Sequence, residues 1–204
     1  MADVTTLCND ALGQLGQTQI DAITDGSHPA NLCLIFYDSL RRSMIRDHRW
    51  NFAKSWQALS QDVEAPPIKW TYQYTTPANV LRVWAIDQYN LIPFEVIRGA
   101  DEIKKVACNQ AAVVAELTFD VTNPDQWDGM FYMVMSTALA WKLAPGVIGG
   151  DTGLKTARDK FIEVFGSPAQ GINGLLKEAK AVDGQEESTL VLQSTSLTTD
   201  IRNG

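Results

Sequence analysis

The chain has 204 residues, of which 45% are hydrophobic, enough to bury the core of one domain or of one domain with an insertion. Its formal net charge of −7 argues against a protein that holds nucleic acid by neutralising phosphates, because such binding needs an excess of Lys and Arg. Cys8, Cys33 and Cys108 are odd in number and widely spaced, which excludes a disulfide framework and a paired-cysteine zinc site. We therefore expect reduced, buried thiols.

The first fifty residues predict two helices. From Val4 to Leu15 apolar residues recur at steps of three and four, and Gly16 can end this helix. A second helix is expected to begin after Ser27, with Pro29 in its first turn, and to end near His48. Basic residues lie on the face of this helix opposite its apolar stripe or just beyond its end: Arg41, Arg42, Arg46 and Arg49.

From about residue 55 the apolar period changes to that of a strand. Trp70, Tyr72 and Tyr74 alternate with polar residues, which predicts a strand that ends at Pro77. Three aromatic side chains on one face can stack on the bases of a single strand. Because Lys69 is the only cation in this strand, we expect packing against the rest of the protein instead.

Three more strands are expected in the middle third of the chain. The segments 80–86 and 91–97 flank a polar turn at 87–90, as in a hairpin. Pro93 lacks an amide hydrogen, which places the second segment at a sheet edge or a bulge. With a further strand within 112–119, these segments predict a small antiparallel sheet inserted between helices.

Helical spacing returns after residue 122. Asn123 can cap a helix whose first turn contains Pro124, and Pro145 and Gly146 are expected to end it. Apolar residues surround nearly the whole of this helix, so it should be the central one. Its helical spacing is carried by Trp127, Phe131, Val134, Ala138 and Trp141.

Two helices are expected to follow, at about 151–165 and within 168–181. The glycine-rich stretch before the first of them lacks the spacing and the lysine of a phosphate-binding loop. We interpret it as a turn, with Asp151 or Thr152 capping the next helix.

The predicted fold class is α+β, mainly α. Residues 1–54 and 121–182 form a helical bundle, residues 55–120 an inserted antiparallel β domain, and residues 183–204 an extended C-terminal arm. Ordering the 22 residues of the arm costs about 20–40 kcal/mol, whereas burial of five apolar side chains returns only about 1.5–3 kcal/mol each. We expect the arm to become ordered on another chain, by strand addition for example. The apolar residues available for this contact are Leu190, Val191, Leu192, Leu197 and Ile201.

The sequence contains little that predicts catalysis. Only His28 and His48 offer imidazoles, both in settings typical of a surface, and the acidic pair Glu186 and Glu187 lies in the arm. We therefore expect no catalytic or metal site and no cofactor. The longest apolar run, 130–135, is far shorter than the ~20 residues of a membrane span, and no signal-like segment opens the chain, so we expect a protein that is neither secreted nor membrane-bound.

The order of several motifs resembles one family. The helix "ALGQLG" is followed by Trp50-Asn51-Phe52-Ala53 after an arginine-bearing helix, then by Tyr72-x-Tyr74-x-x-Pro77 with Leu81-Arg82, and finally by "WDGMFYMVMSTALAWKLAPGVIGG". Together these pieces, spanning residues 7–181, resemble the head-to-tail adaptors of tailed bacteriophages, called tail tubular protein A in short-tailed phages.

The resemblance implies a structural protein of the virion neck without enzymatic activity, synthesised in the cytoplasm of the host bacterium. Its members assemble as a dodecameric ring between the portal protein and the tail tube or nozzle protein, and the genomic DNA passes through transiently. In this chain the resemblance implies that Trp50, Asn51 and Phe52 form a structural junction between the bundle and the β domain. No motif covers the arm, whose partner is open between the portal and an adjacent adaptor, and Arg41, Arg42, Arg46 and Arg49 are candidates for a channel or interface surface.

Two other functions compete with a connector. A nucleic-acid-binding module would use Arg41, Arg42, Arg46 and Arg49, although six aspartates in the first fifty residues offset these charges. An enzyme is the weakest alternative. A His48 paired with a carboxylate in a deep apolar pocket would favour it.

Overall fold

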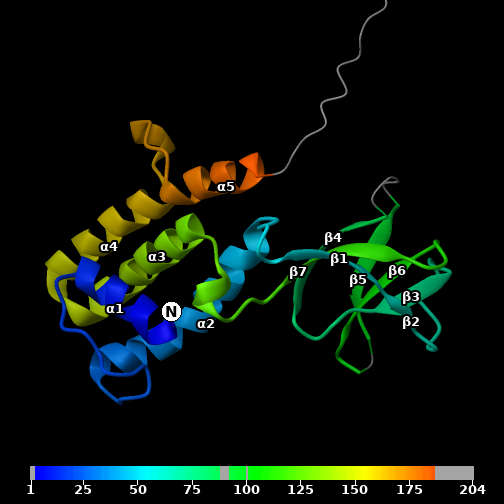
Figure 1. Cartoon of the computed structure of the whole chain (residues 1–204), viewed down its shortest axis with the longest axis horizontal. Coiled ribbons are helices and arrows are strands. Elements are labelled where there is room, and N and C mark those ends of the chain that lie inside the picture. Colours follow the sequence, from blue (N-terminus) through cyan, green and yellow to red (C-terminus); the bar gives the residue numbers. More distant parts are fainter. Residues whose placement is uncertain (1–2, 88–91, 100, 187–204) are drawn as a thin grey trace, which may run out of the picture.

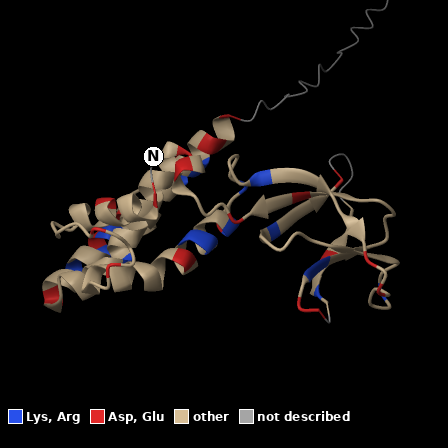
Figure 2. Cartoon of the chain, turned by 60° about the horizontal axis from the view of Figure 1, so that its bottom comes forward, with Lys and Arg blue, Asp and Glu red and all other residues tan. Residues whose placement is uncertain are grey.

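The computed structural model describes residues 3–87, 92–99 and 101–186. A helical bundle and a β domain lie side by side in an elongated molecule (Figure 1), and a view turned by 60° shows the same separation (Figure 2). The chain enters the β domain after its second helix and returns to the bundle before its third. The predicted α+β class, with an antiparallel β domain inserted into a helical bundle, is confirmed.

The first two helices begin where their capping residues predict. Helix α1 (Val4–Gln14) is capped by Asp3, whose carboxylate accepts a hydrogen bond from the Thr6 amide at 2.7 Å. Helix α2 (His28–Asp47) is capped by Ser27, with a proline in its first turn. Gly16, just after α1, has a φ of 66°, which favours glycine and ends the helix as expected.

Helix α3 (Gly129–Val147) is the central helix, as predicted, and it packs against α1, α2, α4 and α5. Its predicted ends are wrong. Residues Pro124–Gln126 form a separate 3₁₀ turn, and Asp128 rather than Asn123 caps α3. Pro145 lies inside the last turn, where it removes only one backbone hydrogen bond, and the amide of Ile148 still bonds the carbonyl of Ala144 at 3.0 Å.

The last two long helices also differ from prediction at their ends. Helix α4 (Gly150–Phe165) has Gly149 as its N-cap residue, whose φ of 74° turns the chain, so Asp151 and Thr152 lie inside the first turn and do not cap it. A 3₁₀ turn, Pro168–Gln170, precedes α5 (Leu175–Gln185). Helix α5 extends past residue 183, the predicted start of the arm, because Asp183 is buried against the β1 entry segment.

The β domain consists of two antiparallel sheets within the described residues. One sheet has the strand order β1-β7-β4 and the other β2-β3-β6-β5. The first contains β1 (Lys54–Ala58), β4 (Val80–Ile86) and β7 (Val114–Phe119). The second contains β2 (Ser60–Gln61), β3 (Tyr72–Thr75), β5 (Phe94–Arg98) and β6 (Lys104–Cys108).

The predicted hairpin between 80–86 and 91–97 is wrong. Strand β4 pairs with β7, whereas β5 pairs with β6, so the two segments belong to different sheets. Pairing with distant strands lets both sheets bury apolar residues in one shared core, which a two-stranded hairpin could not provide. Strand β5 is an edge strand directly after Pro93, as expected, and the strands β1, β2 and β6 were not predicted.

The row of aromatic residues does not form an exposed face. Strand β3 begins at Tyr72, and Trp70 lies before it, with its indole N–H donating to Glu95 at 3.0 Å. Tyr74 is buried, and its hydroxyl donates to the carbonyl of Gln110 at 2.7 Å. Gln73, predicted to lie on a polar face, is buried as well. These contacts agree with packing inside the protein rather than stacking on bases.

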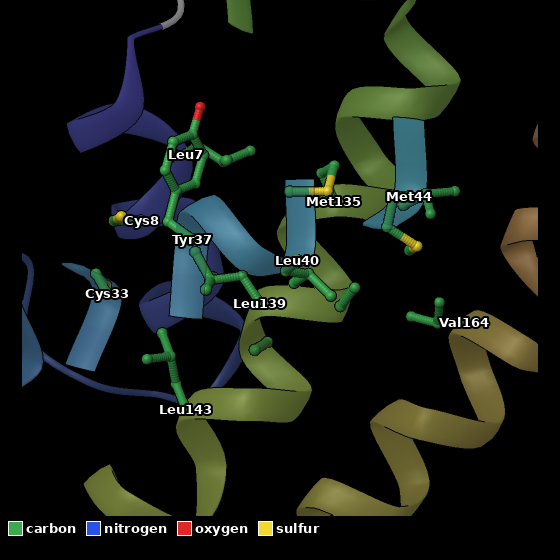
Figure 3. Packing of buried hydrophobic residues seen from close by; sticks show 14 of the residues in the cluster. Leu7, Cys8, Cys33, Tyr37, Leu40, Met44, Met135, Leu139, Leu143 and Val164 are labelled. Carbon is green, nitrogen blue, oxygen red and sulfur yellow. The ribbon is translucent and has the colours of Figure 1, made fainter. Parts of the chain in front are cut away.

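Each domain has its own core. Figure 3 shows the bundle core, in which Leu7 from α1, Tyr37 from α2 and Leu139 from α3 lie together. Leu81 from β4 belongs to this core, whereas the adjacent Val80 belongs to the β core, so one strand contributes to both. Among the helices that the structure describes, none combines the length and apolar character needed to cross a bilayer.

The three cysteines are buried and unpaired, as predicted: Cys8, Cys33 and Cys108. The neighbouring thiol of Cys33, together with burial, raises the pKa of Cys8. The Cys8 thiol therefore stays protonated at neutral pH and acts as a small apolar side chain.

Candidate interaction site at the junction of the two domains

The segment that follows α2 is held in the bundle core by aromatic rings. Trp50 is completely buried, and its indole N–H donates to the carbonyl of Met44 at 3.0 Å. Its ring centroid lies 4.7 Å from that of Phe131 in α3, and Phe52 lies 4.9 Å from the same ring. These contacts set the direction in which the chain leaves α2 and enters β1.

Asn51 fastens this segment to α5. Its backbone N–H donates to the carboxylate of Asp183 at 2.9 Å, and its side-chain amide donates to the backbone carbonyl of Asp183 at 2.7 Å. The second carboxylate oxygen of Asp183 lies 3.0 Å from Nε2 of His48. Asp183 is only 4% exposed, so α5 is tied to the junction by a buried, fully bonded carboxylate.

His48 is therefore not the surface residue that its sequence neighbours suggested, since only 27% of its side chain is exposed. It pairs with a carboxylate, which is one of the features that would favour an enzyme. However, the Asp183 oxygen that does not contact His48 accepts the Asn51 amide, so the carboxylate has a structural task. The other histidine, His28, is exposed, with its ring nitrogen 3.2 Å from the carbonyl of Gly146.

Arg41 differs from the other arginines of α2 because it is buried. Its guanidinium donates to both carboxylate oxygens of Asp120 at 2.9 and 3.1 Å, and it also bonds Asp38. Burial opposes its charge, but the hydrogen bonds to Asp120 and Tyr37 outweigh this and raise the pKa of Arg41. The expectation that Arg41 lies on an exposed face is wrong, because it joins α2 to the segment after β7.

Arg42, Arg46 and Arg49 remain at the surface. The Arg42 side chain is 59% exposed, with its nearest carboxylate, Asp120, at 3.9 Å. Arg49 forms an ion pair with the buried Glu116 at 3.3 Å. Arg46 is exposed, and its backbone carbonyl accepts a hydrogen bond from Arg82 at 3.3 Å. Only Arg42 and Arg46 thus keep guanidinium groups that are largely uncommitted.

Two cations of the β domain, Arg82 and Lys104, lie close to these arginines of α2. Nζ of Lys104 donates to the carbonyls of Val80 and Leu81 at 3.1 and 3.2 Å. Burial, followed by the nearby charges of Arg46 and Arg42, lowers the pKa of Lys104. Figure 2 shows basic residues along the end of α2 and on the strands that follow. We call Arg42, Arg46, Arg82 and Lys104 the junction cation cluster.

Sequence reasoning missed the β-domain half of this cluster. Arg82 alternates with the buried Leu81 and Val83, a pattern that indicates an outward-facing side chain. Its ring partner was not predictable: the guanidinium carbon lies 3.5 Å from the ring centroid of Trp84. Nothing in the sequence around Lys104 indicates its position beside α2.

An open groove of about 650 Å³ lies next to the cluster, between α2, α3, α4, α5 and β4. We call it the junction groove. Its apolar lining consists of Leu40, Met44, Trp141, Phe165 and Leu176. Arg46, Arg82 and Lys142 supply positive charge to the groove. Asp47 also lines it, and its carboxylate forms an ion pair with Lys180. The groove thus combines an apolar surface with cations that form no ion pair among the residues that the structure describes.

The described residues contain no group of three or more His, Cys, Asp or Glu side chains that could hold a metal ion. The predicted arm contacts Leu190, Val191, Leu192, Leu197 and Ile201 lie outside the described residues. No protein-family model matches this sequence, and no curated protein matches it either.

Proposed function

We propose that this protein is a structural connector of a tailed-bacteriophage virion: a head-to-tail adaptor that forms a ring between the portal and the tail and surrounds the DNA exit channel. The observation that carries the proposal is the junction. Trp50 and Asn51 use their polar groups to hold the segment that leads into the β domain against α2 and α5, so the segment with the most varied chemistry in the chain has a structural task. This use of the "RWNFA" segment agrees with the family that the motif order resembles.

Ring assembly also needs two different surfaces that fit each other, because a heterologous interface joins unlike patches of neighbouring subunits. The described residues offer two separate apolar surfaces. Leu34 and Ile35 on α2 are 49% and 64% exposed, and Val63 and Ile68, in the loop between β2 and β3, are completely exposed. Because the two surfaces lie in different domains, they suit contacts between neighbouring subunits of a ring.

Imaging of the purified chain mixed with portal rings from the same virion tests the proposal. We expect added density as a ring below the portal, with one subunit per symmetry position. A variant lacking residues 187–204 should bind the portal more weakly or form incomplete rings. Unchanged portal binding and ring formation by the truncated chain would contradict the role given to the arm, and the absence of any ring with the full chain would contradict the connector.

A nucleic-acid-binding module is the second candidate, favoured by the crowding of Lys104 with Arg42 and Arg46. Only two of the four arginines first considered remain uncommitted, and the chain is acidic overall. Filter binding of duplex DNA across a salt series separates the two functions. Micromolar affinity with a steep salt dependence, lost in Arg46→Ser, would support the module, and weak binding at all salt concentrations would support the connector.

A further inference from the structure

We propose that the junction groove binds the C-terminal arm of a second copy of this chain, with Leu190 and Leu192 on its apolar lining and Glu186 and Glu187 toward its cations. The inference rests on the proposed function only in requiring that copies of the chain lie close together. It names the receptor surface that the connector proposal leaves open between the portal and an adjacent adaptor.

The apolar side of the groove is suited to aliphatic side chains. The rings of Trp141 and Phe165 meet edge to face at 5.6 Å, and Phe165 remains 38% exposed. Leu176 lies beside them at the start of α5. The volume of about 650 Å³ falls in the range of about 300–1,000 Å³ that is usual for ligand pockets. An exposed apolar surface of this kind is typical of a docking site.

The charges of the groove are complementary to one part of the chain. Arg46, Arg82 and Lys142 line the groove, and no described carboxylate forms an ion pair with any of them. In the arm, the acidic pair Glu186–Glu187 is followed after two hydroxyl residues by Leu190-Val191-Leu192. An extended segment would put Leu190 and Leu192 on the same face, about 10 and about 16 Å from Glu187 at roughly 3.3 Å per residue.

The length of the chain favours a second copy as the source of this triplet. Ten residues of α5 separate Leu176 from Glu186, about 15 Å along the helix at 1.5 Å per residue. Leu190 comes four residues after Glu186 and can lie at most about 14 Å from it. To lie along the groove, the triplet of the same chain would have to reverse direction directly after α5, and its Leu190 would stop short of Leu176 even when fully extended. The arm of a neighbouring copy has no such limit.

Peptide binding to the full-length chain tests the groove. The receptor carries Leu190→Asp and Leu192→Asp, so that the arms of other receptor copies do not compete. The probe is a fluorescein-labelled peptide with the sequence of residues 184–204. We expect saturable binding that weakens as salt rises, and loss of binding when the peptide carries the same two aspartates. The groove variant Leu176→Glu should weaken binding at least about tenfold, a difference of about 1.4 kcal/mol.

Two further variants keep the test decisive if Leu176→Glu does not fold. Arg46→Ser with Lys142→Ser alters only side chains at the groove surface and should weaken binding severalfold and reduce its salt dependence. Leu154→Glu, on an exposed position of α4 outside the groove, is the matched control and should bind like the parent. Absence of saturable binding, or binding that the groove variants leave unchanged, would overturn the inference.

Photo-crosslinking identifies the copy that supplies the arm. The full chain with benzoylphenylalanine in place of Val191 is mixed in equal amounts as ¹⁴N and ¹⁵N protein and irradiated. Crosslinks of mixed isotope content to the peptides containing Met44, Phe165 or Leu176 support the inference. Crosslinks within one copy only, or to a different surface, overturn it. If the peptide does not bind the parent groove yet rings form on the portal, the connector stands without this inference. If the peptide binds in the groove but no rings form, the connector fails alone.

Discussion

The helical bundle and the β domain bury charge in different ways. The bundle has a large, continuous apolar core, and its buried ionic groups, Arg41 and Asp183, lie where it meets other segments. The smaller β domain contains Lys105, whose side chain is only 2% exposed, with carboxylates around it. Its partners are Asp62 at 2.6 Å, Glu64 at 2.8 Å and Asp101 at 3.3 Å.

The difference shows how core size sets the need for ionic contacts. A bundle around a central apolar helix buries enough surface to hold its elements together. The β domain has short strands, and Lys105 draws together two loops that would otherwise contribute little to its core. Hydrogen bonds to Asp62 and Glu64 raise the pKa of Lys105, so it remains charged inside the domain. Four substitutions test this contrast, from the largest expected effect to the smallest.

Removal of the ring of Phe131 should destabilise the bundle most. This ring contacts those of Trp50, Phe52 and Trp127, and it is completely buried. Phe131→Ala should lower the free energy of unfolding by about 3–5 kcal/mol, because it leaves a cavity among aromatic groups. Urea unfolding followed by circular dichroism measures the loss. Met133→Ala, at a position 40% exposed on the same helix, should cost under about 1 kcal/mol, and equal effects of the two would refute the account of the core.

The arginines of α2 should separate into structural and surface residues. Arg41→Ala leaves Asp120, which is 10% exposed, without its bidentate partner, and should cost about 3 kcal/mol. Arg46→Ala, five residues further along α2 and exposed, should change stability by less than about 0.5 kcal/mol. Thermal and urea unfolding of both variants provide the comparison. Similar stabilities would mean that the Arg41–Asp120 contact does not join the domains as described.

The contact between α5 and the junction should make a smaller contribution. Asp183→Ala leaves the buried N–H of Asn51 without an acceptor and should cost about 1–3 kcal/mol. Glu178→Ala, at an exposed position of α5, serves as the control and should be nearly neutral. Limited proteolysis should also cleave the α5 segment faster in Asp183→Ala. Equal cleavage rates in variant and parent would argue that α5 is held by its apolar contacts alone.

The ion pairs of Lys105 should make the β domain sensitive to acid. The hydrogen bond from Lys105 lowers the pKa of Asp62 below its ordinary value of 3.8. The contribution of Asp62 is therefore present above about pH 3.8 and is lost as pH falls through its lowered pKa. Asp62→Asn should reduce stability at pH 6 and flatten its decrease between pH 5 and 3.

Unfolding midpoints in urea across this pH range measure the effect of Asp62→Asn. Asp159→Asn, an exposed position on α4 in the bundle, should leave the shape of the acid dependence as in the parent chain. An unchanged acid dependence in Asp62→Asn would show that Lys105 does not depend on this carboxylate.

The candidate site was only partly predictable from the sequence. Arg41 and Arg42 are adjacent and chemically identical, yet one is buried and the other is exposed. A helix turns about 100° per residue, so which of the two is buried with both its hydrogen bonds on Asp120 depends on how α2 packs against a segment 79 positions away. For the same reason the cluster could not be completed from α2 alone, because Arg82 and Lys104 reach it from the β domain.

The sequence by itself determined where α1 and α2 begin, the central place of α3 and the reduced state of the cysteines. These features depend on neighbouring residues: a capping side chain bonds an amide three positions away, and helical periodicity shows within a few turns. Only the tertiary structure decided which strands pair, that Lys105 is buried among three carboxylates, and that Asp183 fastens α5 to Asn51. Each of these depends on contacts between parts of the chain that are distant in sequence, whose energies become available only when those parts pack together.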